Sequence, residues 1–316
     1  MRMEGVFMLA AQSSTKKRRL TRLERQEEIE GWLFISPIVL GLLLWTLIPV
    51  VASLGLSFMN YWIMKSPQWI GTHNYVRMFT RDADFYQALK VTFSFVAMQL
   101  PAGLAIALFE AVLLNTGARG MAFFRTCFYL PAVVPAVALS LVWRWVLNLN
   151  YGVVNQGLRL VGIKGINFLG DPRTALPTMA VMSWFGVGQA MVIFLAGLLN
   201  IPPSLYEAAE IDGAGRVRTF FSITLPMLTP TIFYMIVMGL IGSFQYFTQA
   251  YILTSGGPLK STYFYNLMIY NVAFKNLQMG YASALAWFLL LIILVLTLSV
   301  FRSSSAWVYY ELEMRK

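Results

Sequence analysis

The sequence has little charge, a single cysteine and a single histidine, and each shortage excludes a class of protein. Asp, Glu, Lys and Arg together make up 12% of the residues, about half of their share in soluble domains. Cys127 and His73 each stand alone, so an intramolecular disulfide, a structural zinc site and a paired-histidine metal site lack their ligands. A catalytic triad would depend on His73 alone. An ordinary water-soluble, disulfide-stabilised or zinc-stabilised globule is therefore not expected.

The sequence also lacks the dipeptide that a nucleotide-binding loop requires. No Gly-Lys pair occurs anywhere in the chain, so the phosphate-binding pattern G-x-x-x-x-G-K-[ST] is absent. We therefore do not expect this chain to bind ATP by that route. What the chain has in excess is apolar residues, at 58% of the total, with a mean hydropathy of +0.64.

The apolar residues gather in six long runs without Asp, Glu, Lys or Arg. A membrane-spanning helix needs about 20 mostly apolar residues, and each run is long enough to hold one. The runs are continuous rather than alternating, which favours helices over a β-barrel. The sequence thus predicts an all-α integral membrane protein with six transmembrane helices, placed near residues 32–58, 89–113, 122–147, 178–199, 227–253 and 280–302.

Several prolines, among them Pro131 and Pro135, fall within or at the ends of these spans. We expect them to kink helices, because neighbouring helices in a bilayer can satisfy the freed carbonyl groups. Small residues at Gly280, Ala282, Ala284 and Ala286 predict close helix packing in the last span.

Basic residues before the first span set the expected orientation. By the positive-inside rule, residues 1–30 form a cytoplasmic segment, residues 31–303 form the membrane domain and residues 304–316 form a cytoplasmic tail. Both termini are then expected in the cytoplasm. The cluster Lys16–Arg19 predicts an anchor on anionic membrane lipid rather than a nucleic-acid site. The segment before the first span contains seven basic residues, which are Arg2, Lys16, Lys17, Arg18, Arg19, Arg22 and Arg25.

The predicted inner loop between the fourth and fifth spans, residues 201–226, is the most informative segment. Ser204 and Glu207 have the spacing of a helix capping box, Ala208 and Ala209 favour helix, and Gly213 is a natural stop signal. This predicts a short, smooth helix, followed by a second segment over 216–225 with an apolar side. From these residues alone, such a helix either plugs a socket on a partner or merely connects two spans at the membrane surface.

The same residues resemble a known family signature. Glu207-Ala208-Ala209, Asp212-Gly213-Ala214 and then Phe220, Ile223, Leu225 and Pro226 resemble, in order and spacing, the signature loop of permease subunits of binding-protein-dependent ABC importers. Further segments resemble the carbohydrate-uptake branch of this family, of the maltose and glycerol-3-phosphate type. They are Phe124-Arg125, Leu130-Pro131, Val142–Trp145, Leu253–Pro258, Ser261-Thr262, Ala273-Phe274 and Gly280–Ala284. The likeness covers roughly residues 30–303 and is greatest for the first of two paired permeases.

The resemblance implies a type I importer permease that is not itself an enzyme and that lies in the cytoplasmic membrane of a bacterium or archaeon. Its expected partners are a second permease in a heterodimer, two ATPase subunits that bind ATP and Mg²⁺, an external solute-binding protein, a sugar or related solute, and membrane lipid, but no nucleic acid. The signature loop would be the coupling helix, which converts closure of the ATPase into rocking of the spans. By this likeness the ATPase contact belongs to Glu207, Ala208, Ala209, Asp212 and Gly213.

The substrate pathway is expected among neutral polar and aromatic residues at membrane depth. Such groups are candidates for sugar binding, although polar residues in spans more often bond one helix to another. The candidates are Trp184, Gln189, Ser243, Gln245, Tyr246 and Gln249.

Charge near the inner side of the membrane suggests one further contact. Glu110 and Arg125 both lie close to the predicted inner surface, and we expect them to form an ion pair across the hairpin of spans two and three. The alternative is that each reaches the surface separately.

Two other functions have weaker support in the residues. An integral membrane enzyme would need a clustered acid, base or nucleophile, and the carboxylates here are scattered. An ion-driven secondary transporter usually shows internal repeats and intramembrane carboxylates, for which Glu110 is the sole candidate.

Overall fold

The computed structural model describes residues 21–116 and 118–309, and these residues are almost entirely helical. The chain divides into two compact units, Met1–Ser53 and Leu54–Lys316. The basic cluster Lys16–Arg19 and the last residues of the tail lie outside the described residues. The helical composition and the spans below confirm the predicted all-α membrane fold.

The described part of the first unit is helical, and the helix continues to Ser57. Helix α1 runs over Arg22–Leu42 and continues through a π-helical turn, Leu43–Leu47, into α2, Ile48–Ser57. Together they form a candidate span of 36 residues, so the helix begins ten residues before the predicted start. The reason is a capping box: Thr21 Oγ1 accepts from the Glu24 amide at 3.3 Å, and Glu24 Oε2 accepts from the Thr21 amide at 2.7 Å, which satisfies amides at the helix start.

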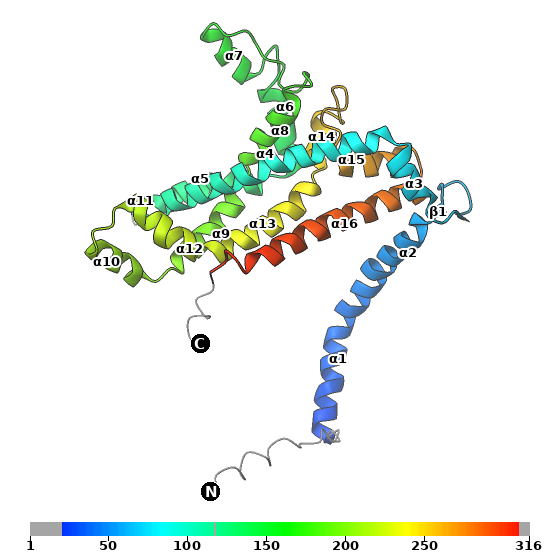
Figure 1. The fold of residues 1–316 in the computed structure, drawn as a ribbon, viewed down its shortest axis with the longest axis horizontal. Coiled ribbons are helices and arrows are strands. Elements are labelled where there is room, and N and C mark those ends of the chain that lie inside the picture. The colour runs from blue at the N-terminus through cyan, green and yellow to red at the C-terminus, as the bar shows by residue number, and fades with distance from the viewer. Residues whose placement is uncertain (1–20, 117, 310–316) are drawn as a thin grey trace. The chain divides into compact units, whose positions relative to one another are not determined.

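Helix α4, Ala83–Leu114, is the longest helix of the second unit and packs against at least five others. Its start is fixed by Asp82, whose Oδ1 accepts from the amides of Asp84 and Phe85. In Figure 1, α4, α13 (Thr229–Phe244) and α16 (Met279–Ser304) run beside one another. The prediction of spans over 89–113 and 280–302 is confirmed, with α4 extending six residues earlier.

The third predicted span is two helices rather than one. Helix α5, Met121–Val133, meets α6, Ala136–Val146, at an angle of 96°. The break follows from Pro135, which lacks an amide donor and holds the preceding residue extended; Val134 has φ −67° and ψ 129°. The expectation of a kink near these prolines was right, but an uninterrupted span over 122–147 was wrong.

The fourth predicted span is also broken. Helices α8, Ala175–Trp184, and α9, Gly188–Leu199, are bent by 43°. Gly188 starts α9 where the backbone of α5 passes, because a Cβ there would lie 2.5 Å from the Phe128 carbonyl oxygen. By length and composition the described residues hold four straight candidate spans, or six when each bent pair is counted as one.

Shorter elements connect the spans. On the predicted outer side lie an antiparallel pair, β1 (Met59–Asn60) and β2 (Gln68–Trp69), and helices α3 (His73–Thr80) and α7 (Val153–Leu160). The fifth span is α13 followed by α14, Thr248–Leu253, and the loop to α16 holds α15, Tyr265–Tyr270, with a π-helical turn over Asn271–Lys275. Three apolar clusters, centred on α4 with α16, α4 with α9, and α4 with α8, form the core.

The close packing predicted for Gly280 is confirmed. A Cβ on Gly280 would lie 2.1 Å from the Met59 carbonyl oxygen, and the Gly280 amide donates to the Tyr61 carbonyl at 3.1 Å. The start of α16 therefore lies directly against β1, which only a residue without a side chain permits.

Candidate functional site

The predicted coupling helix is α10, Pro203–Ile211. Its start differs from the prediction: the N-cap residue is Pro202, and no side chain caps the helix, so the capping box of Ser204 and Glu207 was wrong. Pro203 occupies the first helical position, where the fixed φ of proline suits the helix and its missing amide costs no hydrogen bond. Ser204 is consequently inside the helix.

The end of α10 agrees with the prediction at Gly213. This residue has φ +72°, and its amide donates to the Glu210 carbonyl at 3.0 Å, while the Ala214 amide donates to the Ala209 carbonyl at 2.9 Å. These two bonds are the Schellman arrangement, which uses carbonyls that would otherwise lack partners. The left-handed conformation at Gly213 therefore fixes where α10 ends.

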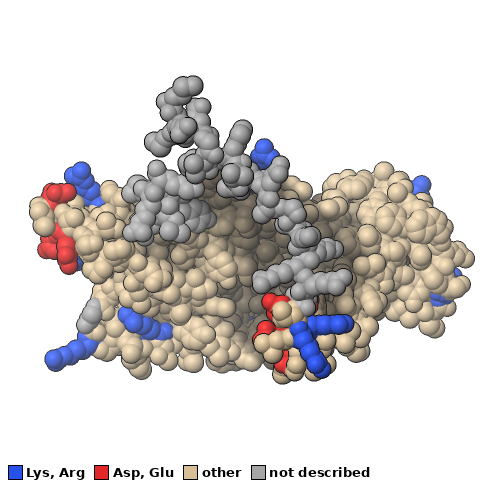
Figure 2. All heavy atoms as spheres, turned by 90° about the horizontal axis from the view of Figure 1, so that it is seen from below, with Lys and Arg blue, Asp and Glu red and all other residues tan. Residues whose placement is uncertain are grey.

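The five predicted contact residues do not share one face. Glu207, Ala208, Asp212 and Gly213 are exposed, whereas Ala209 is only 8% exposed and packs within the chain. Figure 2 shows acidic side chains gathered over the α10 end of the second unit, with basic side chains beside them. The accessible surface of α10 is thus acidic, with Ile211 at 86% exposure as an apolar addition that the sequence prediction missed.

A short segment joins α10 to the fifth span, as predicted for residues 216–225. It consists of α11 (Arg216–Thr219), a π-helical turn (Phe220–Thr224) and α12 (Leu225–Met227). The Tyr206 hydroxyl on α10 lies 3.2 Å from the Thr224 hydroxyl, and a cavity of about 460 Å³ separates α10 from this segment. The hydroxyl contact ties α10 to the residues that lead directly into α13.

Four of the six predicted pathway residues line three cavities, one is exposed, and one bonds two helices together. Trp184 lines a cavity of about 500 Å³, Gln189 lines one of about 320 Å³, and Tyr246 and Gln249 line one of about 190 Å³. Gln245 is exposed, and its carbonyl accepts from Asn266 Nδ2 at 3.1 Å. The last two cavities adjoin, because Ser183 and Gly186 line both of them. Contact of the six residues with substrate remains a prediction.

Ser243 has a helix-bonding role that the sequence allowed as the alternative. Its hydroxyl donates to Gln99 Oε1 at 2.6 Å and so joins α13 to α4. Gln99 also lines the cavity that contains Gln189, and the sequence analysis missed it. The available signal was an amide side chain inside the predicted second span, which is uncommon enough in a membrane helix to be noted.

The ion pair predicted between Glu110 and Arg125 is not formed. The Arg125 guanidinium donates instead to the Leu114 carbonyl, from Nε at 3.3 Å and from Nη2 at 2.9 Å. Leu114 is the last residue of α4, so its carbonyl lacks a partner within the helix and attracts a cation. Glu110 Oε2 is buried and has no hydrogen-bond partner among the described residues.

The described residues contain no cluster of three or more His, Cys, Asp or Glu side chains that could hold a metal ion. The polar features of the described chain are instead the exposed surface of α10 and the carboxylate and amide groups along the cavities.

Comparison with known proteins gives a consistent set of matches. Residues 99–306 match the family "Binding-protein-dependent transport system inner membrane component". The chain is 48% identical to the probable ABC transporter permease protein YesP of Bacillus subtilis (strain 168), over 92% of this chain and 95% of the relative. It is 36% identical to the lactose transport system permease protein LacF of Rhizobium radiobacter, over 87% and 94%.

A solved structure agrees in fold. A chain from the crystal structure of a bacterial ABC transporter involved in the import of the acidic polysaccharide alginate superposes with a TM-score of 0.78 at 26% identity. The superposition covers 90% of this chain and 99% of that chain. The overall fold of the chain therefore also occurs in a crystallised transporter.

Proposed function

The chain belongs to the family of binding-protein-dependent transport system inner membrane components, and from this premise we propose that it imports a sugar and meets its ATPase through α10. As a member, it is a membrane-embedded permease of an ABC importer, a transport component rather than a catalyst. This membership replaces the two alternatives, a membrane enzyme and an ion-driven carrier. The transported solute is a sugar, or a related polyol, oligosaccharide or glycerol-3-phosphate.

The proposed ATPase contact rests on the exposed surface of α10. Glu207, Glu210 and Asp212 present carboxylates to solvent, and Ile211 presents a branched apolar side chain beside them. An exposed apolar residue within an acidic surface fits a cleft with an apolar floor and a basic rim. Ala208 adds almost no volume, so the helix can enter such a cleft deeply.

The path of coupling follows the connections of α10. The Tyr206–Thr224 hydroxyl contact holds α10 against the segment that enters α13. The Schellman bonds at Gly213 fix where the chain leaves α10 toward that segment. A displacement of α10 by the ATPase would therefore be passed to α13, and from α13 to α4 through the bond between Ser243 and Gln99. This chain of packed contacts is what alternating access requires of a coupling element.

The remaining parts of the proposal are the assembly and its orientation. The chain pairs with a second, different permease and with two ATPase subunits, which carry the ATP and Mg²⁺. Both termini and α10 lie in the cytoplasm, and a solute-binding protein docks on the opposite side. The support for the orientation is the basic N-terminal segment.

The experiment is affinity purification of the tagged chain from its native host in mild detergent, with Ala208→Trp as the test variant. Ala208 is exposed, so the added indole would block docking without disturbing the packing of the chain itself. We expect wild type to retain a second permease and an ATPase subunit, and Ala208→Trp to lose the ATPase subunit only. Ala83→Trp, at an exposed alanine at the start of α4, is the matched control.

Retention of the ATPase by Ala208→Trp at the wild-type level would contradict the proposed contact. The solute class is tested separately by uptake of radiolabelled lactose, maltose and glycerol-3-phosphate in host cells with and without the gene for this chain. Loss of uptake of one of these solutes supports the sugar assignment, and unchanged uptake of all three contradicts it.

A further inference from the structure

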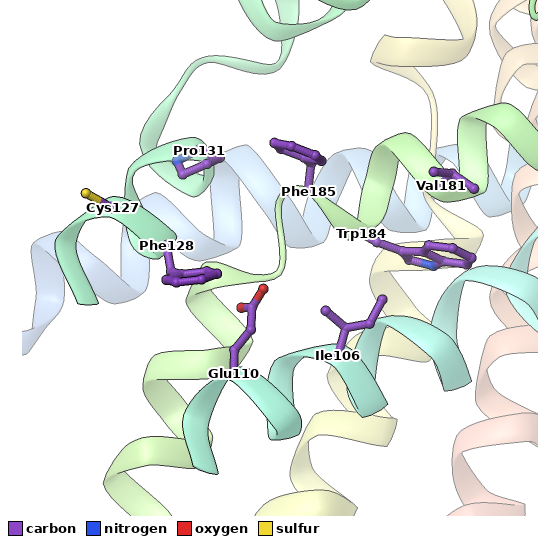
Figure 3. A pocket seen from close by; sticks show the side chains of 8 residues that line it. All are labelled: Ile106, Glu110, Cys127, Phe128, Pro131, Val181, Trp184 and Phe185. Carbon is purple, nitrogen blue, oxygen red and sulfur yellow. The ribbon is translucent and has the colours of Figure 1, made fainter. Parts of the chain in front are cut away.

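The largest of the cavities described above contains a carboxylate that the proposed mechanism does not use. The cavity, of about 500 Å³, lies between α4, α5 and α8 and is lined mainly by apolar and aromatic side chains, including Ile106, Phe128, Trp184 and Phe185. Figure 3 shows the Glu110 carboxylate rising from α4 into the space that Phe128 and Phe185 border. Trp184, which lines the same cavity, also has a buried indole N–H without a hydrogen-bond partner among the described residues.

Glu110 is placed where a negative charge is costly. It lies one turn from the end of α4 at Leu114, where the helix dipole favours cations and disfavours anions. Its Oε2 atom is buried and has no hydrogen-bond partner among the described residues. Taking a carboxylate oxygen out of water without a hydrogen bond or a counter-ion is unfavourable. A cation that enters the cavity would therefore stabilise the Glu110 carboxylate.

The nearby cation within the chain is already engaged. Arg125 donates twice to the Leu114 carbonyl, and the ion pair recorded among the described residues joins Lys260 to Asp84, in the loop before α15 and at the start of α4. The Arg125 bond supplies a partner for the last carbonyl of α4, which the helix itself cannot. Among the described residues of the second unit, no cation forms an ion pair with Glu110.

The cavity walls show how an outside group would reach it. Phe185 is 60% exposed and Phe128 is 42% exposed, so the apolar walls continue onto the outer surface of the chain. A lipid tail would fill the apolar space but would leave the carboxylate unpaired. A neutral sugar would pack against the aromatic walls and bond to the carboxylate, but it would bring no positive charge to Glu110. A lysine or arginine side chain matches both, with an apolar stem for the walls and a cationic head for Glu110.

We propose that this cavity is the socket for a basic side chain of the second permease, which forms a buried ion pair with Glu110 across the interface between the two permeases. This inference rests on the proposed function, since it requires a second permease. We assign the cation to a protein side chain because a partner helix would hold the apolar stem against the cavity walls and the charged end at Glu110. The pair would set the register of one permease against the other, as buried polar groups do in helix assemblies.

The test is a series at Glu110 in the full importer, purified through a tag on this chain. Glu110→Gln keeps the size and removes the charge, and Glu110→Lys sets two cations against each other. We expect the second permease retained per tagged chain to fall about tenfold in Glu110→Gln and further in Glu110→Lys. Glu28→Gln, a neutralised glutamate on the exposed part of α1, is the matched control, and membrane levels of each variant are measured in the same samples.

A photo-crosslink identifies the occupant directly. p-Benzoylphenylalanine in place of Phe185 sits at the rim of the cavity, and in the assembled importer we expect its adduct to be with a span of the second permease that carries a lysine or arginine. Adducts with lipid alone or with the sugar would overturn the inference. Equal retention of the second permease by wild type and Glu110→Gln would also overturn it, whether or not transport is lost.

The two proposals fail in different ways. If the wild-type chain retains no second permease, the proposed assembly is wrong, and the inference is wrong with it. If wild type retains the second permease and the Glu110 variants retain it equally, the assembly stands and only the ion pair is refuted.

Discussion

The left-handed end of α10 gives a graded test of coupling. Gly213 has φ +72°, and no atom lies within 4 Å of a Cβ built there. Gly213→Ala therefore adds no clash, and its cost is the left-handed conformation alone, about 1–2 kcal/mol. Such a cost reduces the population with a correctly formed helix end by about 5- to 30-fold.

Two further substitutions extend the series in both directions. Asparagine tolerates the left-handed region better than alanine, so Gly213→Asn is expected to be the mildest variant. Gly213→Pro is expected to be the most severe, because proline cannot adopt a positive φ and has no amide to donate to the Glu210 carbonyl. The order of ATPase retention should then be glycine, asparagine, alanine and proline.

The assay measures two quantities on the purified importer: the ATPase subunit retained per tagged chain and the rate of ATP hydrolysis stimulated by the binding protein. Gly162→Ala is the control, since Gly162 has φ +78°, also has no atom within 4 Å of a built Cβ, and follows α7 on the predicted outer side. Wild-type behaviour of Gly213→Pro would refute the reasoning. An equal loss in Gly162→Ala would show that the strain acts on the whole fold rather than on coupling.

Three other substitutions test the packing and electrostatics of the second unit. Gly280→Ala places a methyl group 2.1 Å from a backbone carbonyl of β1 and should lower the free energy of unfolding by about 1–3 kcal/mol, measured as a lower thermal midpoint of the complex. Gly242 has open space around it, so Gly242→Ala should leave the midpoint unchanged. The hydrogen bond to Asp84, and then its charge, raise the pKa of Lys260, so the ion pair is present below the ordinary lysine pKa and is lost as pH rises through the raised value. Asp84→Asn should therefore shift the reaction of Lys260 with amine reagents to lower pH, and an unchanged profile would contradict the pairing. Tyr206→Phe removes the hydroxyl contact between α10 and the fifth span, so ATP hydrolysis should continue with weaker coupling to transport; equal uptake per ATP would argue against this path.

The membrane spans were predictable from the sequence because their signal is local. Uninterrupted apolar runs determine where a helix can lie in a bilayer, and α4 and α16 lie where those runs predict. The 96° bend between α5 and α6 was only half predictable. Pro135 marks its position, but the angle depends on what packs on each side of the break, and no property of a single run contains that information.

The candidate site divides in the same way. The end of α10 follows from Gly213 because a left-handed residue at a helix end has few alternatives to glycine, whereas its start at Pro203 competed with a plausible cap at Ser204, and both fit the local pattern. Ala209 and Ala208 are indistinguishable in sequence, yet one is buried and the other exposed. Their separation depends on how α10 lies against the rest of the chain.

The position of Arg125 shows the limit of charge pairing as a sequence argument. Glu110 and Arg125 have opposite charges and similar depth, which made an ion pair the natural expectation. A helix end, however, offers a basic residue several unpaired carbonyl groups that do not show in the charges of the sequence. The Leu114 carbonyl accepts from two nitrogens of the Arg125 guanidinium, Nε and Nη2. The carboxylate that this arrangement leaves unpaired is then the best indication, within the described chain, of where a partner's charge must lie.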